Sequence, residues 1–234
     1  NILEDSVKTE PGTAYTYGIA RGTPIIASSY NSETMKRYCS IHSMNDLNRD
    51  QLISNLEAPL AANLHNFSGN KILVLNGAVS GAKMETYLPG EINFTRASVI
   101  FNDAVESIDR DLFEPRIKSY IWVQGESDYG TEVEQYKTWF IEMHDDLTGI
   151  GIFSDYKFDA AFISLVRATS PTIAQIQLIL DPGTSVILGA TSAQSFSIDA
   201  GTLQSDGVHY TQLGDNILGS ELAESIADYY LRRL

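Results

Sequence analysis

This sequence has little cysteine, few basic residues and no long apolar run. Its single cysteine, Cys39, excludes an internal disulfide and a zinc site built from cysteines. Lysine and arginine total 16 against 30 acidic residues, and the formal net charge of −14 argues against nucleic acid or an anionic membrane surface as partner. No apolar run reaches membrane-spanning length, and no signal peptide is visible. We therefore expect a protein that acts on neutral or only locally charged molecules.

The composition suits a folded α/β protein. With 234 residues, of which 43% are hydrophobic, the chain can bury a sizeable core, and we expect one domain over residues 1–234. The chain begins at Asn1 rather than methionine, which favours an excised domain or a processed product. The oligomeric state is not determined by these features.

Short apolar runs alternate with helical patterns. The runs predict buried strands at 71–75, 119–123, 160–166 and 185–188. The periodic segments predict helices at 46–66, 94–112, 131–147, 171–180 and 211–231. Pro59 is expected to interrupt the first helix, and Thr131 to cap the third. This alternation predicts a parallel sheet covered on both faces, which is a three-layer α/β/α sandwich.

Four loops are expected at the C-terminal ends of the strands, where such sheets bind ligands. Residues 12–18 form a tight loop between two glycines in this prediction. The other loops are 76–90, 124–128 and a late loop that holds Asp206 and His209. Candidate site residues are therefore sought in these loops.

The late loop carries an aspartate three residues before a histidine. On a turn, the Asp206 carboxylate can bind the Nδ1–H of His209, which fixes the tautomer and leaves Nε2 free as a base. The alternative is a turn aspartate and a surface histidine at the start of a helix, and for so short a motif alone that alternative is favoured.

A second block changes this balance. Trp122-Val123-Gln124-Gly125-Glu126-Ser127-Asp128 ends a predicted strand. Together with the late Asp-x-x-His, it resembles the SGNH (GDSL-type) hydrolase superfamily, in the branch of sialate O-acetylesterases and carbohydrate esterase family 6. Four blocks occur here in the family's order, so the resemblance spans nearly the whole chain. It implies a flavodoxin-like fold and a serine-type carboxylic ester hydrolase that removes O-acetyl groups from a sugar or polysaccharide without metal or organic cofactor.

The resemblance also implies a role for each matched residue. His209 is the base and Asp206 orients it. The backbone N–H of Gly81 and the side chain of Gln124 donate to the oxyanion, which such donors stabilise by roughly 3 kcal/mol each. Glu126 and Asp128 hold their loop, although solvated loop acids are an equally good interpretation of these two.

The nucleophile block departs from the family's Gly-Gln-Ser pattern. Aligned on Gly12 and Gly18, the pattern places the serine, which also contributes to the oxyanion hole, at Ala14. A second register, on residues 18–20, places it at Ala20 and makes residues 14–17 the end of the first strand.

Three explanations compete for these alanines. The serine has been replaced by engineering, or the domain is a natural pseudoenzyme, or the nucleophile lies elsewhere, at Ser28, Ser29 or Ser80. We favour the first explanation and keep Ala14 ahead of Ala20, because the glycine after Ala14 is better spaced. Ser29 follows a short apolar run and is the main rival, whereas Ser80 adjoins the oxyanion glycine.

Several aromatic and histidine residues have weaker assignments. Four tyrosines flank the predicted loops and are candidates to stack on sugar rings, with half-buried packing as the alternative: Tyr15, Tyr17, Tyr87 and Tyr129. The other three histidines are expected to be surface residues: His42, His65 and His144.

Two other functions stay open. A carbohydrate-binding pseudoenzyme would keep the fold without the nucleophile. A metal hydrolase would use Asp206, His209, Glu126 and Asp128, but one histidine is thin for a transition-metal site. By analogy, an acidic module without disulfides suits a secreted polysaccharide-degrading enzyme or a phage tail spike, with an acetylated carbohydrate as partner; a cytoplasmic location is also compatible.

Overall fold

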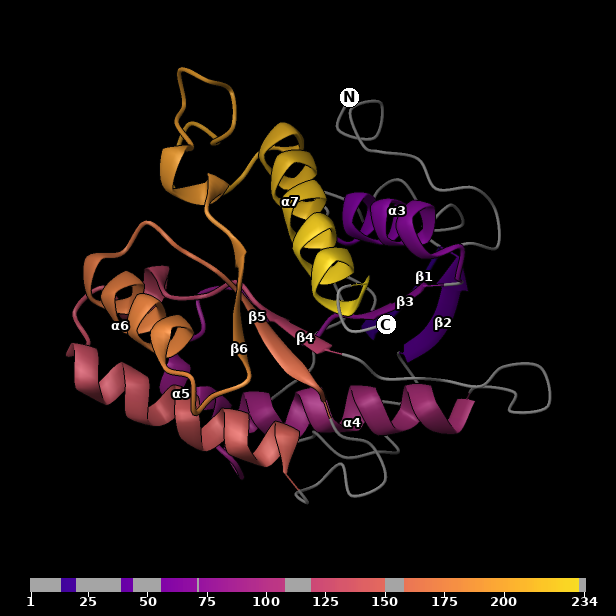
Figure 1. Ribbon diagram of the computed structural model, residues 1–234, viewed down its shortest axis with the longest axis horizontal. Helices are drawn as coiled ribbons and strands as arrows, with labels where there is room; N and C mark the ends of the chain where they lie inside the picture. The colour runs from indigo at the N-terminus through magenta and orange to yellow at the C-terminus, as the bar shows by residue number, and fades with distance from the viewer. Residues whose placement is uncertain are drawn as a thin grey trace. The chain divides into compact units, whose positions relative to one another are not determined.

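The computed structural model describes residues 14–19, 39–43, 56–70, 72–107, 119–149 and 158–231 (Figure 1). These residues divide between two compact units. The first unit comprises Asn1–Tyr17, Ile41–Val74 and Gly189–Leu234, and the second comprises Gly18–Ser40 and Leu75–Leu188. A single domain over 1–234 stays a prediction.

Strands and helices alternate along the described chain. The strands are β1 (Ala14–Ile19), β2 (Cys39–Ser43), β3 (Ile72–Leu75), β4 (Ser119–Trp122), β5 (Ala160–Ser164) and β6 (Val186–Ala190). The α-helices are α3 (Glu57–Ser68), α4 (Ile92–Ser107), α5 (Val133–Thr148), α6 (Thr169–Leu180) and α7 (Gln212–Leu231). Short 3-10 helices occur at η3 (Met84–Tyr87), η4 (Glu126–Asp128) and η5 (Ser192–Ser195).

The strands pair in the orders β2-β1-β3 and β4-β5-β6. β4 and β5 are parallel, with Ser119 opposite Ala160 and Trp122 opposite Ile163. All five residues of β5 are buried, so both faces of this strand are covered, as in a parallel sheet between helices. The predicted α/β class with a parallel sheet is confirmed.

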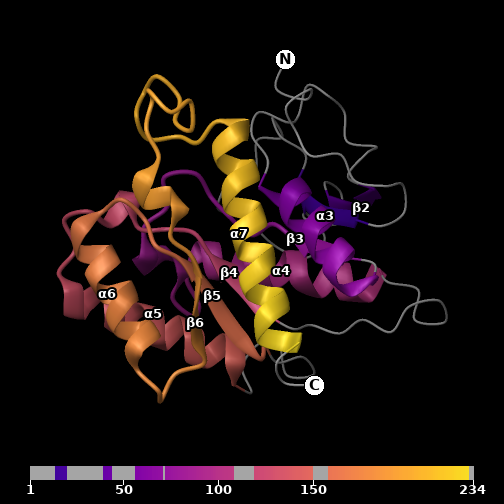
Figure 2. The ribbon, with the colours of Figure 1, turned by 45° about the horizontal axis from the view of Figure 1, so that its top comes forward.

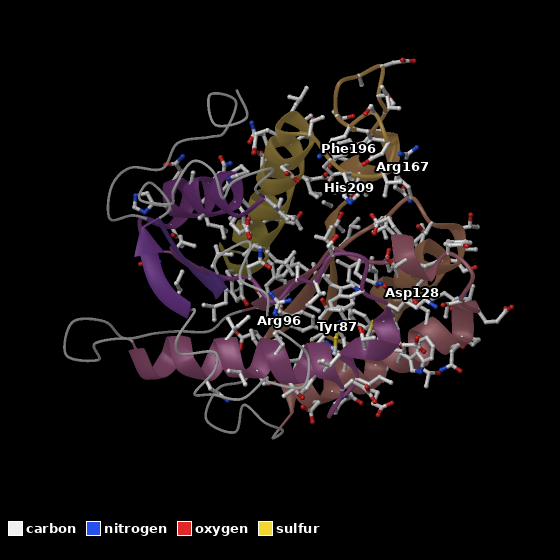
Figure 3. The ribbon with its side chains drawn as sticks, turned by 180° about the vertical axis from the view of Figure 1, so that it is seen from behind. Tyr87, Arg96, Asp128, Arg167, Phe196 and His209 are labelled. Atoms are coloured by element: carbon white, nitrogen blue, oxygen red, sulfur yellow. The ribbon has the colours of Figure 1, made fainter. Side chains whose placement is uncertain are left out.

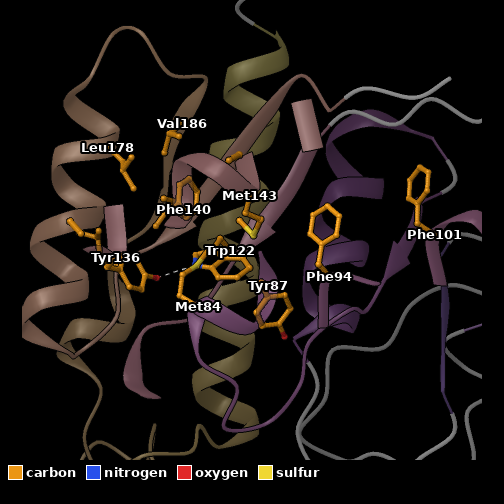
Figure 4. Packing of buried hydrophobic residues seen from close by; sticks show 14 residues of the cluster. Met84, Tyr87, Phe94, Phe101, Trp122, Tyr136, Phe140, Met143, Leu178 and Val186 are labelled. Atoms are coloured by element: carbon orange, nitrogen blue, oxygen red, sulfur yellow. Dashed lines mark hydrogen bonds between the residues drawn. The ribbon is translucent and has the colours of Figure 1, made fainter. Parts of the chain in front are cut away.

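The core of the second unit lies between this sheet and three helices (Figure 4). Ala161 and Ile163 point to one face because side chains alternate along a strand. They pack with Trp122 and with side chains of α4, α5 and α6, among them Phe94, Tyr136, Phe140, Met143 and Leu178. This core supports the loop that follows β4.

In the first unit, α3 packs against α7 (Figure 2). Gly219 permits the close approach, because a Cβ there would lie 2.9 Å from the backbone nitrogen of Leu60. Across the contact, Asn63 Nδ2 donates to Ser220 Oγ at 3.1 Å. α7 is thus fixed within its unit, and it begins directly after the loop that holds His209.

The structure corrects three local predictions. Residues 14–19 form β1 rather than a loop, because alternating aromatic and β-branched residues favour a strand. Pro59 lies in the first turn of α3, where its missing N–H has no helical partner to lose, and so it does not interrupt the helix. Thr131 does not cap α5, since its hydroxyl donates to Asp128 Oδ1 at 3.2 Å instead.

Among the helices in the described ranges, none has the length and apolar character required to cross a membrane.

Candidate active site

The histidine loop, residues 191–211, connects β6 to α7 and folds back on itself. Leu203 and Tyr210 form an antiparallel bridge, and the Gln204 N–H donates to the His209 carbonyl at 2.8 Å. Between them, Gly207 adopts a φ of 69°, a left-handed conformation that glycine reaches at little cost. Asp206 and His209 therefore lie in the turn at the tip of this small hairpin, and Figure 3 labels His209.

The Asp206 carboxylate binds three groups of the tip. Oδ1 accepts the backbone N–H groups of Val208 at 2.9 Å and His209 at 3.0 Å. Oδ2 lies 2.7 Å from His209 Nδ1. The hydrogen bond from His209 and the two backbone N–H groups lower the pKa of Asp206 to about 2. The carboxylate is therefore ionised at neutral pH and can only accept, so Nδ1 carries the proton.

It follows that Nε2 of neutral His209 carries the lone pair. The His209 side chain is 64% exposed, and that of Asp206 is 47% exposed. A solvent-facing imidazole whose Nδ1–H binds a carboxylate directs Nε2 outward, which is the geometry that a general base requires. The hydrogen bond expected from the Asp-x-x-His spacing is present, and the catalytic role stays a prediction.

Side chains of the first unit also hold the histidine loop at both ends. At its start, Glu221 of α7 accepts the backbone N–H groups of Thr191 at 2.8 Å and Ser192 at 3.0 Å. Burial alone would raise the pKa of Glu221, but hydrogen bonds from Ser192 and Thr191 outweigh it and lower the pKa. Near its end, Thr211 Oγ1 donates to the Gly201 carbonyl at 2.6 Å. The sequence alone gave no sign of the Glu221 contact.

In the second unit, Gly81 lies in the glycine turn, residues 79–82. The Ala82 N–H donates to the Val79 carbonyl at 3.2 Å and closes the turn. Gly81 is exposed, with a φ of 71°. Because a Cβ at Gly81 would meet no atom within 4 Å, the glycine is required by its backbone conformation and not by crowding.

Gln124 approaches this turn from the loop after β4, but both of its N–H groups are engaged. Nε2 donates to the Ala82 carbonyl at 3.0 Å and to Asp128 Oδ2. Oε1 accepts from Tyr136 Oη at 3.0 Å. The reverse amide orientation would turn its oxygen toward a carbonyl and a carboxylate, so the network fixes the assignment. In this structure Gln124 therefore has no spare donor for an oxyanion.

Asp128 is fully buried, with 0% exposure, whereas Glu126 is half-buried. Besides Gln124 and Thr131, the Asp128 carboxylate accepts the Met84 N–H at 2.9 Å. Gly125, between Gln124 and Glu126, has a φ of 147°, and a Cβ there would lie 2.6 Å from Val166 Cγ2. Of the two acids, Asp128 is thus a buried hydrogen-bond acceptor and not a solvated loop residue.

Sequence reasoning missed the residues beneath this loop. Tyr136 Oη accepts from Trp122 Nε1 at 3.1 Å. Gln175, also with 0% exposure, donates from Nε2 to the Gln124 carbonyl at 2.8 Å and to Tyr136 Oη at 3.3 Å. Burial raises the pKa of Tyr136, so its hydroxyl stays protonated. A tyrosine and a glutamine at apolar helical spacing were the only signal of this network.

The candidate sugar-stacking tyrosines differ in exposure. Tyr129 is 78% exposed, whereas Tyr87 is 8% exposed. The Tyr87 ring packs edge-on against Trp122 with centroids 5.2 Å apart, and its hydroxyl accepts the Val79 N–H at 3.0 Å. Tyr87 is therefore a packing residue whose ring is not open to a sugar. The side chains of Tyr15 and Tyr17 lie outside the described residues.

The candidate nucleophile positions lie mostly outside the described residues. Ala14 opens β1, but only its backbone is described. Ala20, Ser28 and Ser29 are not described. Ser80 is exposed beside Gly81 in the glycine turn. The nucleophile position therefore stays a prediction.

His144 is buried, which corrects the expected surface position. Its side chain is 4% exposed, and its ring stacks on Phe140 with centroids 5.9 Å apart. Nδ1 lies 2.7 Å from Tyr120 Oη, and Nε2 lies 3.1 Å from Ser185 Oγ. Because α5 has an apolar face against the sheet, this polar residue enters the core by pairing both nitrogens.

The part of the chain that the structure describes contains no group of three or more histidine, cysteine, aspartate or glutamate side chains arranged to hold a metal ion. The metal-hydrolase alternative gains no support from this donor set.

Comparisons with known proteins indicate the family and the fold of this chain. The model of a family described as "Carbohydrate esterase, sialic acid-specific acetylesterase" matches residues 41–228. No curated protein matches the chain significantly. A protein from Arabidopsis thaliana, solved by X-ray crystallography at 1.6 Å resolution, is similar with a TM-score of 0.57 and 19% identity. The match covers 74% of this chain and 66% of that chain, just under two thirds of its length, and at this identity it shows the fold alone.

Proposed function

We propose a reaction for this chain from one premise: it belongs to the family of sialic acid-specific acetylesterases, which are carbohydrate esterases. The reaction is hydrolysis of an O-acetyl ester on a carbohydrate, by a serine nucleophile whose position alanine now occupies. The observation that carries the proposal is the Asp206–His209 pair: His209 Nδ1 lies 2.7 Å from Asp206 Oδ2, and the His209 side chain is exposed.

In the serine form, Nε2 of His209 takes the proton of the serine hydroxyl as its oxygen attacks the acetyl carbonyl. The sugar oxygen then leaves and takes that proton from the imidazolium, which Asp206 stabilises. Water, deprotonated by His209 in turn, attacks the acetyl-enzyme and releases acetate and the free serine. No other group has to gain or lose a proton.

The oxyanion contact is assigned to backbone groups. The Gly81 N–H lies in an exposed turn without a Cβ to obstruct an ester. The N–H of the nucleophile residue itself is the second donor in this proposal. Gln124, first expected to be a donor, would have to give up a bond to the Ala82 carbonyl or to Asp128. The convergence of these groups with His209 stays part of the proposal.

Ala20 is now the better candidate for the nucleophile position. β1 spans Ala14–Ile19, so Ala14 opens the strand and Ala20 directly follows it. In open α/β sheets, ligands bind beyond the carboxyl ends of the strands, which favours the second register. The matched range, 41–228, begins after both positions, so this assignment depends on β1 alone.

The second candidate is a pseudoenzyme that binds acetylated carbohydrate without cleaving it. The observation in its favour is that both registers of the nucleophile block contain alanine. A location outside the cell or on a virion belongs to both candidates, because polysaccharide substrates occur there.

One assay separates these candidates. Ala20→Ser and Ala14→Ser are each tested with p-nitrophenyl acetate and with O-acetylated sialic acid, beside the parent chain. In the serine protease subtilisin, loss of the serine nucleophile lowers kcat by about 10⁶-fold. One of the two serine variants should therefore gain several orders of magnitude in kcat. The gain should vanish when His209→Ala is added. If the parent binds the acetylated sugar without hydrolysing it and neither serine variant gains activity, the pseudoenzyme is correct. A parent that is already active would place the nucleophile elsewhere, with Ser29 as the main rival.

A further inference from the structure

We infer that Asp128 and Gln124 are positioning residues that set the conformation of the glycine turn, and through it the direction of the Gly81 N–H. Only the catalytic consequence rests on the proposed function. We call the two side chains, with their hydrogen bonds to Ala82 and Met84, the clamp; all four residues lie in the second unit.

The two side chains attach to the chain immediately after Gly81. Gln124 Nε2 donates to the Ala82 carbonyl at 3.0 Å, and Asp128 Oδ2 accepts the Met84 N–H at 2.9 Å. The residues that each bond joins are 42 and 44 positions apart in sequence. The peptide groups that follow Ala82 and precede Met84 are thereby fixed from outside the turn.

Apart from these two side chains, the turn is held by the bond from the Val79 N–H to the Tyr87 hydroxyl at 3.0 Å and by packing of Ala82 on the core. Gly81 is exposed, and no atom lies within 4 Å of the position where a Cβ would be. An exposed left-handed glycine pays a larger entropic cost for one conformation than other residues do. The hydrogen bond between Ala82 and Val79 closes the turn, but the clamp supplies the long-range hydrogen bonds.

The clamp is rigid because its charged member is buried and saturated. The Asp128 carboxylate accepts from Met84, Gln124 and Thr131. A buried carboxylate is very costly unless such donors surround it, so the geometry has little freedom. Gln124 is fixed in turn by the Tyr136 hydroxyl. Rigid groups thus connect α5 to the glycine turn.

Amide hydrogen exchange tests the clamp on the chain as it exists. Asp128→Ala removes the acceptor of Met84, and a buried charge-assisted hydrogen bond is strong enough that exchange at Ala82 and Met84 should rise about 10- to 100-fold. Asp128→Asn should stay near the parent, because one amide oxygen can accept from Met84 and Gln124 while its NH₂ donates to the Thr131 hydroxyl.

Phe140→Leu is the matched control, since Phe140 is a buried residue of the same core whose ring contacts Trp122 and His144. It should raise exchange across the second unit without singling out Ala82 and Met84. If Asp128→Ala does not fold, Gln124→Met decides, because it removes the bond to Ala82 at similar volume. The inference would be overturned if exchange in the Asp128 and Gln124 variants rose equally across the second unit. It would also be overturned if Asp128→Asn and Asp128→Ala raised exchange at Ala82 and Met84 by the same factor.

Kinetics in the active serine variant test the consequence. Asp128→Ala should lower kcat on the order of 100-fold with KM within about threefold, as for a lost oxyanion donor, and Asp128→Asn should recover most of it. A loss confined to KM would show that the clamp does not act through the turn. If no serine variant is active, the proposed function fails, and the exchange experiment still decides the clamp.

Discussion

The two loops that carry candidate site residues, one in each unit, are built in opposite ways. At the tip of the histidine loop, Asp206 and His209 are exposed, and their hydrogen bonds join residues two or three positions apart. In the loop after β4 Asp128 is fully buried, and so is Gln175 of α6 beneath it. Besides shorter-range bonds, Asp128 binds Met84 and Gln175 binds the Gln124 carbonyl, 44 and 51 positions away in sequence. In the proposed esterase, His209 needs access to a substrate, whereas Asp128 and Gln124 need rigidity to hold the glycine turn, and burial supplies that rigidity.

This difference predicts opposite responses to substitution. Changes beneath the loop after β4 should lower the stability of the second unit, whereas changes at the tip of the histidine loop should leave stability nearly unchanged and alter only titration and activity. Four experiments test the contrast, in order of decreasing effect.

Gly125→Ala should have the largest effect. A Cβ would lie 2.6 Å from Val166 Cγ2 and 2.8 Å from Pro171 Cβ, at a φ that side chains rarely adopt. The combined overlap and strain should lower the free energy of unfolding by about 3 kcal/mol or more, measured by urea denaturation. Gly130→Ala is the control, because a Cβ there meets no atom within 4 Å, and its effect should stay below about 1 kcal/mol.

Tyr136→Phe should follow. The substitution leaves Trp122 Nε1 without its acceptor and Gln124 Oε1 without its donor, in a buried environment. Leaving buried polar groups unpaired costs about 1–3 kcal/mol. Tyr129→Phe, at a side chain 78% exposed, should change stability by less than about 0.5 kcal/mol. Equal effects of the two in thermal unfolding would contradict the contrast.

Acidification should destabilise the fold through His144. Burial lowers the pKa of His144 from 6.5, against a smaller opposing effect of Asp145. The unfolded chain therefore binds the proton first, and the stability that neutral His144 provides, complete above pH 6.5, is lost as pH falls through its folded pKa. Denaturation at pH 7.5 and pH 5 should show a smaller pH-dependent loss in His144→Gln. A slope unchanged by this substitution would assign the loss to other groups.

The smallest effect concerns titration at the tip of the histidine loop. Hydrogen bonding, first from His209, lowers the pKa of Asp206 from 3.8 to about 2. In His209→Ala this pKa should rise toward 3.8, measured by NMR titration of the carboxyl carbon, while the urea midpoint of unfolding at pH 7 stays close to that of the parent. In the parent, the stabilising contribution of this pair exists above pH 3.8 and is lost as pH falls toward 2. A pKa that does not move would mean that the backbone N–H groups alone set it.

Local pattern was sufficient to predict most of the fold. β3, β4, β5 and β6 lie within two residues of the runs that predicted them, because buried parallel strands are continuous apolar stretches. The prediction of a loop over 12–18 failed at residues 14–18, which lie in β1: the flanking glycines suggested a loop although the intervening residues alternate as in a strand. The alternation between the glycines was the better guide to the structure than the glycines themselves.

For the candidate site residues too, local contacts could be predicted from the sequence and long-range contacts could not. The bond between Asp206 and His209 follows from a spacing of three residues, so the sequence predicts it. The partners of Gln124 do not follow, because Tyr136 and Gln175 reach it only once α5 and α6 have packed on the sheet. His144 shows the same limit, since its two partners, Tyr120 and Ser185, come from other strands or their ends.

The attachment of the histidine loop has a consequence for how such a protein can diversify. Glu221 of α7 grips the first residues of this loop, and α7 itself begins where the loop ends. Both ends of the histidine loop are thus attached to α7, so the segment between them can change in length without moving its ends. Lengthening it twofold would cost only about 0.6 kcal/mol in closure entropy. Insertions at the exposed residues 198–200 could therefore reshape what the protein recognises while leaving the helix and its grip intact.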